Sequence, residues 1–154
     1  MEFIQRLTDL VGAWSGTSRL WLMPGDPGHD SDSTAQVEPV AQGQFFVLSY
    51  TWAFEGDPHD GMIVFPSGAS ETSTRSVWLD SWHMANAVMV CDTTRGDDVV
   101  SLRGSYAAPP GPDWGWRIEI EPGEGSSLVV RMFNITPDGE EALAVLAEYT
   151  RSGG

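Results

Sequence analysis

Gly12-Ala13-Trp14 follows a short apolar segment, and Arg151 lies three residues before the end of the chain. The residues between them form an almost unbroken series of strand-like runs. A meander of this length has two unpaired edges unless its first and last strands pair and close a barrel. In such a barrel Trp14 would lie at the closed end, where a cation from the last strand can rest on its indole face. The pattern therefore predicts a closed sheet.

The strand candidates number about ten, and turn clusters such as Thr136-Pro137-Asp138-Gly139 separate them. Strands at short intervals without helices between them indicate an antiparallel barrel or sandwich rather than an α/β fold. In residues 114–121, Trp and Ile alternate with Gly, Arg and Glu, as expected for a strand with one buried face. The expected strands cover residues 14–22, 34–40, 44–54, 61–65, 74–82, 86–93, 99–107, 115–121, 128–135 and 142–151.

A length of 154 residues fits one domain. Apolar residues at helical spacing predict a short helix over residues 2–10, which could plug one end of a barrel. Turn-forming residues over 23–33 predict a mobile loop. The predicted fold is all-β: a closed, antiparallel up-and-down barrel of about ten strands over residues 13–151, within a single domain over 1–154.

The chain is strongly acidic, with 8 Lys and Arg against 22 Asp and Glu and a formal charge of −14. Such a field repels phosphate backbones and anionic lipid surfaces, so neither nucleic acid nor a membrane is an expected partner. Cys91 is the only cysteine, so no intrachain disulfide can form, and its apolar neighbours predict an inert buried thiol. No leader pattern and no membrane-length apolar run is visible, so a cytoplasmic location is expected.

Five segments resemble a bacterial domain-of-unknown-function family with a lipocalin-like barrel, and the similarity spans most of the chain. Gly12-x-Trp14 together with Arg151 also resembles the calycin signature, in which an arginine from the last strand packs on the tryptophan. The resemblance implies structural roles for Trp14 and Arg151, and it supplies no activity. The segments are Leu10–Gly16, Val77–His83, Pro112–Arg117, Phe133–Gly139 and Glu148–Arg151.

Asp80 and His83 are the polar groups of most interest, because tryptophans surround them in the sequence. A carboxylate between Trp78 and Trp82 is costly to bury unless it is paired, and Arg103 is a candidate partner. Asp80 could anchor a polar ligand group or form a structural salt bridge. On a regular strand Asp80 and His83 point to opposite faces, so a catalytic pair would require a bulge or a turn between them. A histidine that merely bonds a turn is the simpler interpretation of His83.

Three functions stay open. The first is a binding module with a small, mostly apolar or aromatic molecule inside the barrel. The second is an enzyme of isomerase or hydrolase type that uses Asp80 or His83 as a proton carrier. The third is a structural or interaction protein with a filled barrel, for which a homodimer is one arrangement. The expected ligand-contacting residues are Tyr50, Trp52, Trp78, Asp80, Trp82, His83, Trp116 and Asn134.

No cofactor or metal is expected. His29 lies near Asp26, Asp30 and Asp32, but the EF-hand pattern is not met, and solvated turns explain these residues better. The related nitrobindin barrels bind haem through a histidine close to the C-terminus, and this chain has no histidine after His83. Sequence motifs of hydrolases, phosphate-binding loops and zinc proteases are also absent.

Overall fold

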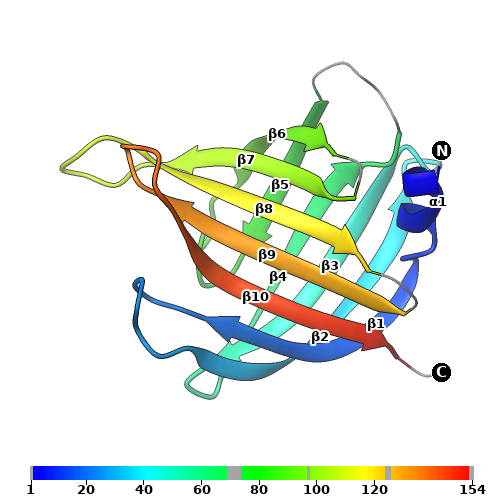
Figure 1. Ribbon diagram of the computed structural model, residues 1–154, viewed down its shortest axis with the longest axis horizontal. Coiled ribbons are helices and arrows are strands. Elements are labelled where there is room, and N and C mark those ends of the chain that lie inside the picture. The colour runs from blue at the N-terminus through cyan, green and yellow to red at the C-terminus, as the bar shows by residue number, and fades with distance from the viewer. Residues whose placement is uncertain (1, 69–73, 97, 124–125, 153–154) are drawn as a thin grey trace.

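The computed structural model describes residues 2–68, 74–96, 98–123 and 126–152. Within these ranges ten antiparallel strands form a closed barrel, and one short helix, α1 (Glu2–Thr8), precedes them (Figure 1). The predicted all-β closed barrel is therefore confirmed. No helix in the described ranges has the length and apolar character needed to cross a membrane. The strands are β1 (Gly12–Leu20), β2 (His29–Val40), β3 (Phe45–Phe54), β4 (Asp57–Pro66), β5 (Thr74–Asp80), β6 (Met89–Arg95), β7 (Val100–Tyr106), β8 (Trp114–Pro122), β9 (Ser127–Ile135) and β10 (Glu141–Arg151).

The strands follow one another around the barrel in chain order, and pairing of β1 with β10 closes it. Trp14 is the register partner of Arg151, whose guanidinium carbon lies 4.2 Å from the centre of the indole ring. The same guanidinium donates hydrogen bonds to the carbonyl oxygens of Val11, at 2.8 Å, and Asp9. The contact expected between Trp14 and Arg151 is thus present, and it ties the last strand to the turn before β1.

The packing of Arg151 against the first strand requires a glycine at position 12. Its φ of 130° is a conformation that side chains rarely adopt, and a Cβ atom there would lie 2.9 Å from Nη1 of Arg151. The absence of a side chain at Gly12 leaves room for the guanidinium. The Gly-x-Trp spacing and the terminal arginine therefore form one packing unit.

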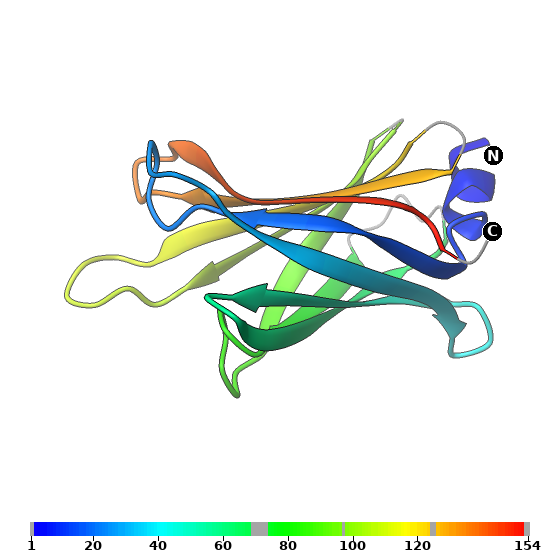
Figure 2. The ribbon, with the colours of Figure 1, turned by 90° about the horizontal axis from the view of Figure 1, so that it is seen from below.

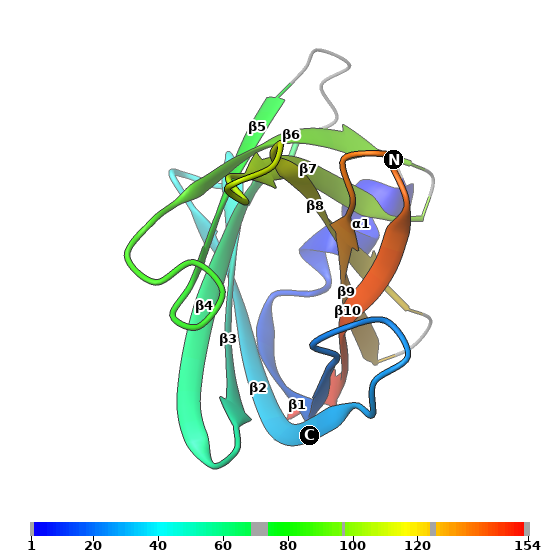
Figure 3. The same cartoon turned by 90° about the vertical axis from the view of Figure 1, so that its left-hand side faces the viewer.

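The two ends of the barrel differ. The end of β10 and helix α1 lie together at one end (Figure 2), where Leu7 and Leu10 are buried. The view along the barrel in Figure 3 shows α1 at the far end, while the loops after β1, β7 and β9 surround the near end. We call this near end the mouth. The predicted helical plug is present, although α1 stops at Thr8 and residues 9 and 10 form a turn.

The inward faces follow the alternation in the sequence. On β3 the side chains of Phe46, Leu48, Tyr50 and Trp52 are buried, and on β8 those of Trp116, Ile118 and Ile120 are buried. Side chains of alternate residues on a strand point to opposite faces, so these residues build the core from both sides of the barrel.

Several predicted boundaries are wrong, and two of them have a clear physical cause. The loop expected over 23–33 ends earlier, because β2 begins at His29 and pairs with β1 from Leu20 onwards. Ladder hydrogen bonds thus override the turn preference of the Asp and Ser residues there. The strand expected over 74–82 stops at Asp80, because the Asp80 carboxylate accepts hydrogen bonds from the backbone N–H groups of Trp82 and His83, both 2.9 Å long. This side-chain capping folds the chain into a turn.

Candidate functional site

The mouth of the barrel contains a pocket of about 420 Å³. This volume lies within the usual range of about 300–1,000 Å³ for small-molecule sites. Within the described part of the chain, its lining holds no carboxylate and no guanidinium group. The lining residues are Leu20, Trp21, Leu22, Trp78, Trp82, His83, Met84, Met89, Tyr106, Ala107, Trp116, Asn134 and Ala144.

Aromatic rings form the wall and floor of this pocket. Trp78 of β5 and Trp116 of β8 stack across the barrel, with ring centroids 5.3 Å apart and an interplanar angle of 8°. Trp82, on the turn after β5, is 36% exposed and meets the His83 ring edge-on at 4.7 Å. The indole Nε1 of Trp116 is buried and has no hydrogen-bond partner among the described residues. Such a donor is costly to leave unpaired.

Asp80 and His83 are in contact, because the chain turns after Asp80 and does not continue as a regular strand. Nδ1 of His83 lies 3.1 Å from Oδ1 of Asp80, although this approach is not aligned as a hydrogen bond. The turn after Asp80 reverses the chain and returns the imidazole over the carboxylate. The turn that a pair of these residues required is therefore present.

Asp80 is held by a network that crosses three strands. The hydroxyl of Tyr50 donates to Oδ2 of Asp80 at 2.6 Å and accepts a hydrogen bond from Nε1 of Trp78 at 2.9 Å. Gly61 of β4 lies between them, as the register partner of both Tyr50 and Asp80. A Cβ atom at Gly61 would lie 2.3 Å from the end of the Tyr50 ring, so glycine lets this ring reach across β4. The suggestion that Arg103 pairs with Asp80 is wrong, because Tyr50, His83 and the turn supply the contacts.

The ionisation of this network follows from burial and contacts. Burial raises the pKa of Asp80, but the contacts with His83 and Tyr50 lower it by more than burial raises it. The pKa of Asp80 therefore lies below its ordinary value. Burial, followed by the charge of Asp80, raises the pKa of the Tyr50 hydroxyl well above its ordinary value. The site therefore holds a buried carboxylate and a tyrosine that stays protonated.

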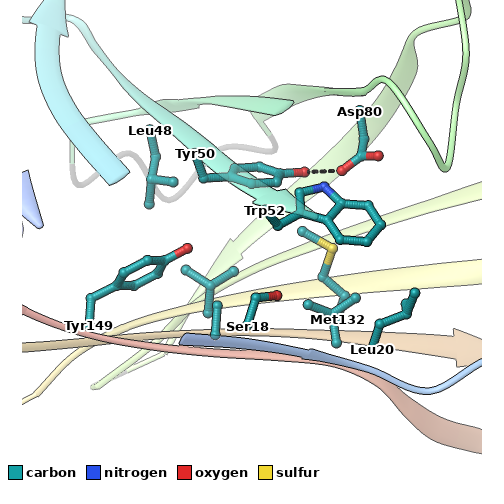
Figure 4. Close-up of a pocket in the computed structure, with 11 residues that line it drawn as sticks. Ser18, Leu20, Leu48, Tyr50, Trp52, Asp80, Met132 and Tyr149 are labelled. Carbon is teal, nitrogen blue, oxygen red and sulfur yellow. Dashed lines mark hydrogen bonds between the residues drawn. The ribbon is translucent and has the colours of Figure 1, made fainter. Parts of the chain in front are cut away.

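A second, much smaller cavity lies deeper in the barrel, next to Tyr50, Trp52 and Asp80 (Figure 4). Its volume is about 20 Å³, and a single water needs about 10–15 Å³ by the same kind of measure. Ser18 and Tyr149 close its other side. The barrel centre is thus almost filled by side chains, as the alternative of a filled barrel expects. The pocket at the mouth is far larger than this inner cavity.

The residues expected to contact a ligand divide between the two cavities. Tyr50, Trp52 and Asp80 line the small inner cavity, whereas Trp78, Trp82, His83, Trp116 and Asn134 line the mouth pocket. Tyr106, which was not among the expected residues, also lines the mouth pocket, and its hydroxyl donates to Oδ1 of Asn134 at 2.5 Å. Tyr106 continues the alternation of Val100 and Leu102, so its position on the inward face could have been predicted from the sequence. Trp21, Leu22 and Met84 lie outside the strands and left no such signal.

The other polar candidates lie outside the pocket. His29 and Asp30 belong to β2 rather than to a solvated turn; the His29 ring packs against Phe54, and Asp30 forms an ion pair with Arg19. Among the described residues, no group of three or more His, Cys, Asp and Glu side chains is arranged to hold a metal ion. Cys91 is buried, and burial raises the pKa of its thiol to about 11, as expected for an unreactive cysteine.

Comparison with known proteins supports the fold. The crystal structure of Rv2717c from M. tuberculosis is similar to the chain, with a TM-score of 0.60 and 14% sequence identity over 99% of this chain and 98% of that one. At this identity the similarity concerns the fold alone. No curated protein shows significant sequence similarity. Residues 4–151 match a family described as "Protein of unknown function (DUF1579)", and the chain therefore belongs to this uncharacterised family.

Proposed function

We propose that the protein binds a small, mostly apolar or aromatic molecule at the mouth of the barrel. The observation that carries the proposal is the pocket of about 420 Å³, which is lined by indole rings and, among the residues that the structure describes, has no acidic or basic side chain other than His83. A concave, mainly apolar site with a few polar groups is typical of small-ligand pockets. Asn134 and His83 would supply the polar selectivity.

The charge of the protein limits the classes of ligand that suit the pocket. The formal charge of −14 makes the approach of an anion unfavourable, and no guanidinium among the described lining residues compensates for it. Apolar area that a ligand buries against the rings contributes roughly 25 cal/mol per Å². A planar, neutral molecule therefore fits the site better than a polar anion.

Tryptophan fluorescence tests this proposal. We expect a neutral nitroaromatic such as 4-nitroanisole to quench the emission in a saturable way, because it would stack near Trp78, Trp82 and Trp116. Trp82→Ala should weaken binding about tenfold, a loss of about 1.4 kcal/mol. Trp114→Ala is the matched control, since Trp114 does not line the pocket. Lack of saturable quenching across a broad panel of neutral aromatic probes would contradict the proposal.

A further inference from the structure

We propose that His83 is a proton acceptor in the mouth pocket, and that the preferred ligand is an aromatic molecule with a weakly acidic hydroxyl group, such as a phenol. This inference rests on the proposed binding function and names the ligand class for the same site. Three features of the described residues carry it: the contact of His83 with Asp80, the rings around His83, and the composition of the pocket.

The contact with Asp80 fixes the tautomer of His83. A carboxylate oxygen lies 3.1 Å from Nδ1, and although the approach is not aligned as a hydrogen bond, the negative charge favours an N–H over a lone pair on that nitrogen. Nδ1 therefore carries the hydrogen, and in the neutral ring the lone pair is on Nε2. Asp80 itself is held in place by Tyr50 and by the backbone of the turn. A ligand group that meets Nε2 must then be a hydrogen-bond donor.

The surroundings of His83 suit a positively charged ring. Four indole rings lie around the imidazole, with centroid distances between 4.7 and 5.6 Å. The Asp80 carboxylate, 3.1 Å from Nδ1, supplies the charge opposite to that of an imidazolium. The His83 side chain is 12% exposed. The four rings are those of Trp52, Trp78, Trp82 and Trp116.

The other titratable groups near His83 do not compete for the proton. Burial raises the pKa of Tyr106, which also lines the pocket, and its hydroxyl already donates to Asn134. Tyr50 lies behind Asp80 and donates to it. His59 packs against Trp52 and forms a hydrogen bond with Ser81, and it does not line the pocket. His83 is thus the basic group that the pocket presents.

The proposed step moves one proton. The O–H bond of the bound phenol breaks, its electron pair stays on the oxygen, and the proton forms a bond with Nε2 of His83. The products are a phenolate and an imidazolium that lies beside Asp80. The net charge of the site does not change, which removes the objection that an acidic protein repels anions from solution. No other reactant is needed.

A pair of probes tests the inference on the intact chain. 4-Nitrophenol and 4-nitroanisole have nearly the same shape, but only the phenol carries a transferable proton, and its phenolate has a distinct visible absorption band. Measured below the solution pKa of 4-nitrophenol, the bound phenol should show the phenolate band. It should also bind at least about tenfold more tightly than the ether, as expected for a charge-assisted hydrogen bond.

Variants assign the effect to His83. His83→Gln should abolish the phenolate band and the preference for the phenol while 4-nitroanisole still binds. His29→Gln, the matched control outside the pocket, should change neither. If both probes bind equally and the bound phenol keeps its neutral spectrum, this inference is wrong and the proposed binding function stands. If neither probe binds, both fail. Even if His83→Gln does not fold, the comparison of the two probes on the unmodified protein shows whether the bound phenol loses its proton.

Discussion

Gly61→Ala tests the network that holds Asp80. The new Cβ atom would lie 2.3 Å from Cζ and the hydroxyl oxygen of Tyr50 and 2.7 Å from the carbonyl oxygen of Leu79. The backbone of β5 resists displacement, so the Tyr50 ring must move. Overpacking of this kind costs about 1–3 kcal/mol. Loss of the hydrogen bond from Tyr50 to the charged Asp80 costs about 1.5–3 kcal/mol more. We expect a decrease of about 2.5–6 kcal/mol in the free energy of unfolding.

Urea unfolding followed by tryptophan fluorescence, together with thermal melting, measures this change. For a chain of this size the melting temperature should fall by at least about 5 °C. Gly68→Ala is the matched control, because a Cβ atom there meets nothing within 4 Å and the effect should stay below about 0.5 kcal/mol. In a Tyr50→Ala background the cost of Gly61→Ala should shrink, because the ring is gone. Equal melting of the Gly61 and Gly68 variants would refute the reasoning.

Two further predictions concern Arg151 and Asp80. Arg151→Ala should lower the free energy of unfolding by about 1–3 kcal/mol in urea titrations, because it removes the contact with the Trp14 indole and the hydrogen bond to Val11; unchanged melting would show that this contact is not structural. The pKa of Asp80 lies below 3.8 in the folded protein, so the unfolded chain takes up the proton first as the pH falls. The stability that the Asp80 carboxylate contributes is therefore complete above the pKa of the unfolded chain. It is lost as the pH falls through the lower pKa of the folded protein. Asp80→Asn should therefore flatten the decline in stability between about pH 5 and pH 3, and a decline as steep as that of the unmodified protein would contradict this assignment.

The barrel was predictable because its cause is local and repeats along the chain. Alternation on β3 and β8 identifies the buried face strand by strand, and the pairing of Trp14 with Arg151 follows once the two edges must meet. The boundaries near His29 and Asp80 were not predictable to the residue. Ladder pairing extends β2 into residues with turn preference, and a side-chain hydrogen bond ends β5 two residues early.

The candidate site was predictable as a set of residues but not as an arrangement. Aromatic and polar side chains on inward faces could be named, and five of them line the mouth pocket. Their division between two cavities depends on how far each ring reaches across the barrel. The contact between Asp80 and His83 depends on a turn formed by side-chain hydrogen bonds, which the alternating pattern of a regular strand does not contain.

The amino-acid sequence alone determined that the chain is an acidic, all-β protein whose first and last strands meet, since period-two alternation and the need to pair edge strands act on short segments. Only the tertiary structure decided where the cavities lie. How completely a barrel is filled depends on the summed volumes of the side chains that point inward from all strands. Here the side chains leave a cavity of about 20 Å³ at the centre and a pocket of about 420 Å³ at the mouth. It also decided that Gly61 lets Tyr50 reach Asp80, because residues 50, 61 and 80 become neighbours only through strand pairing.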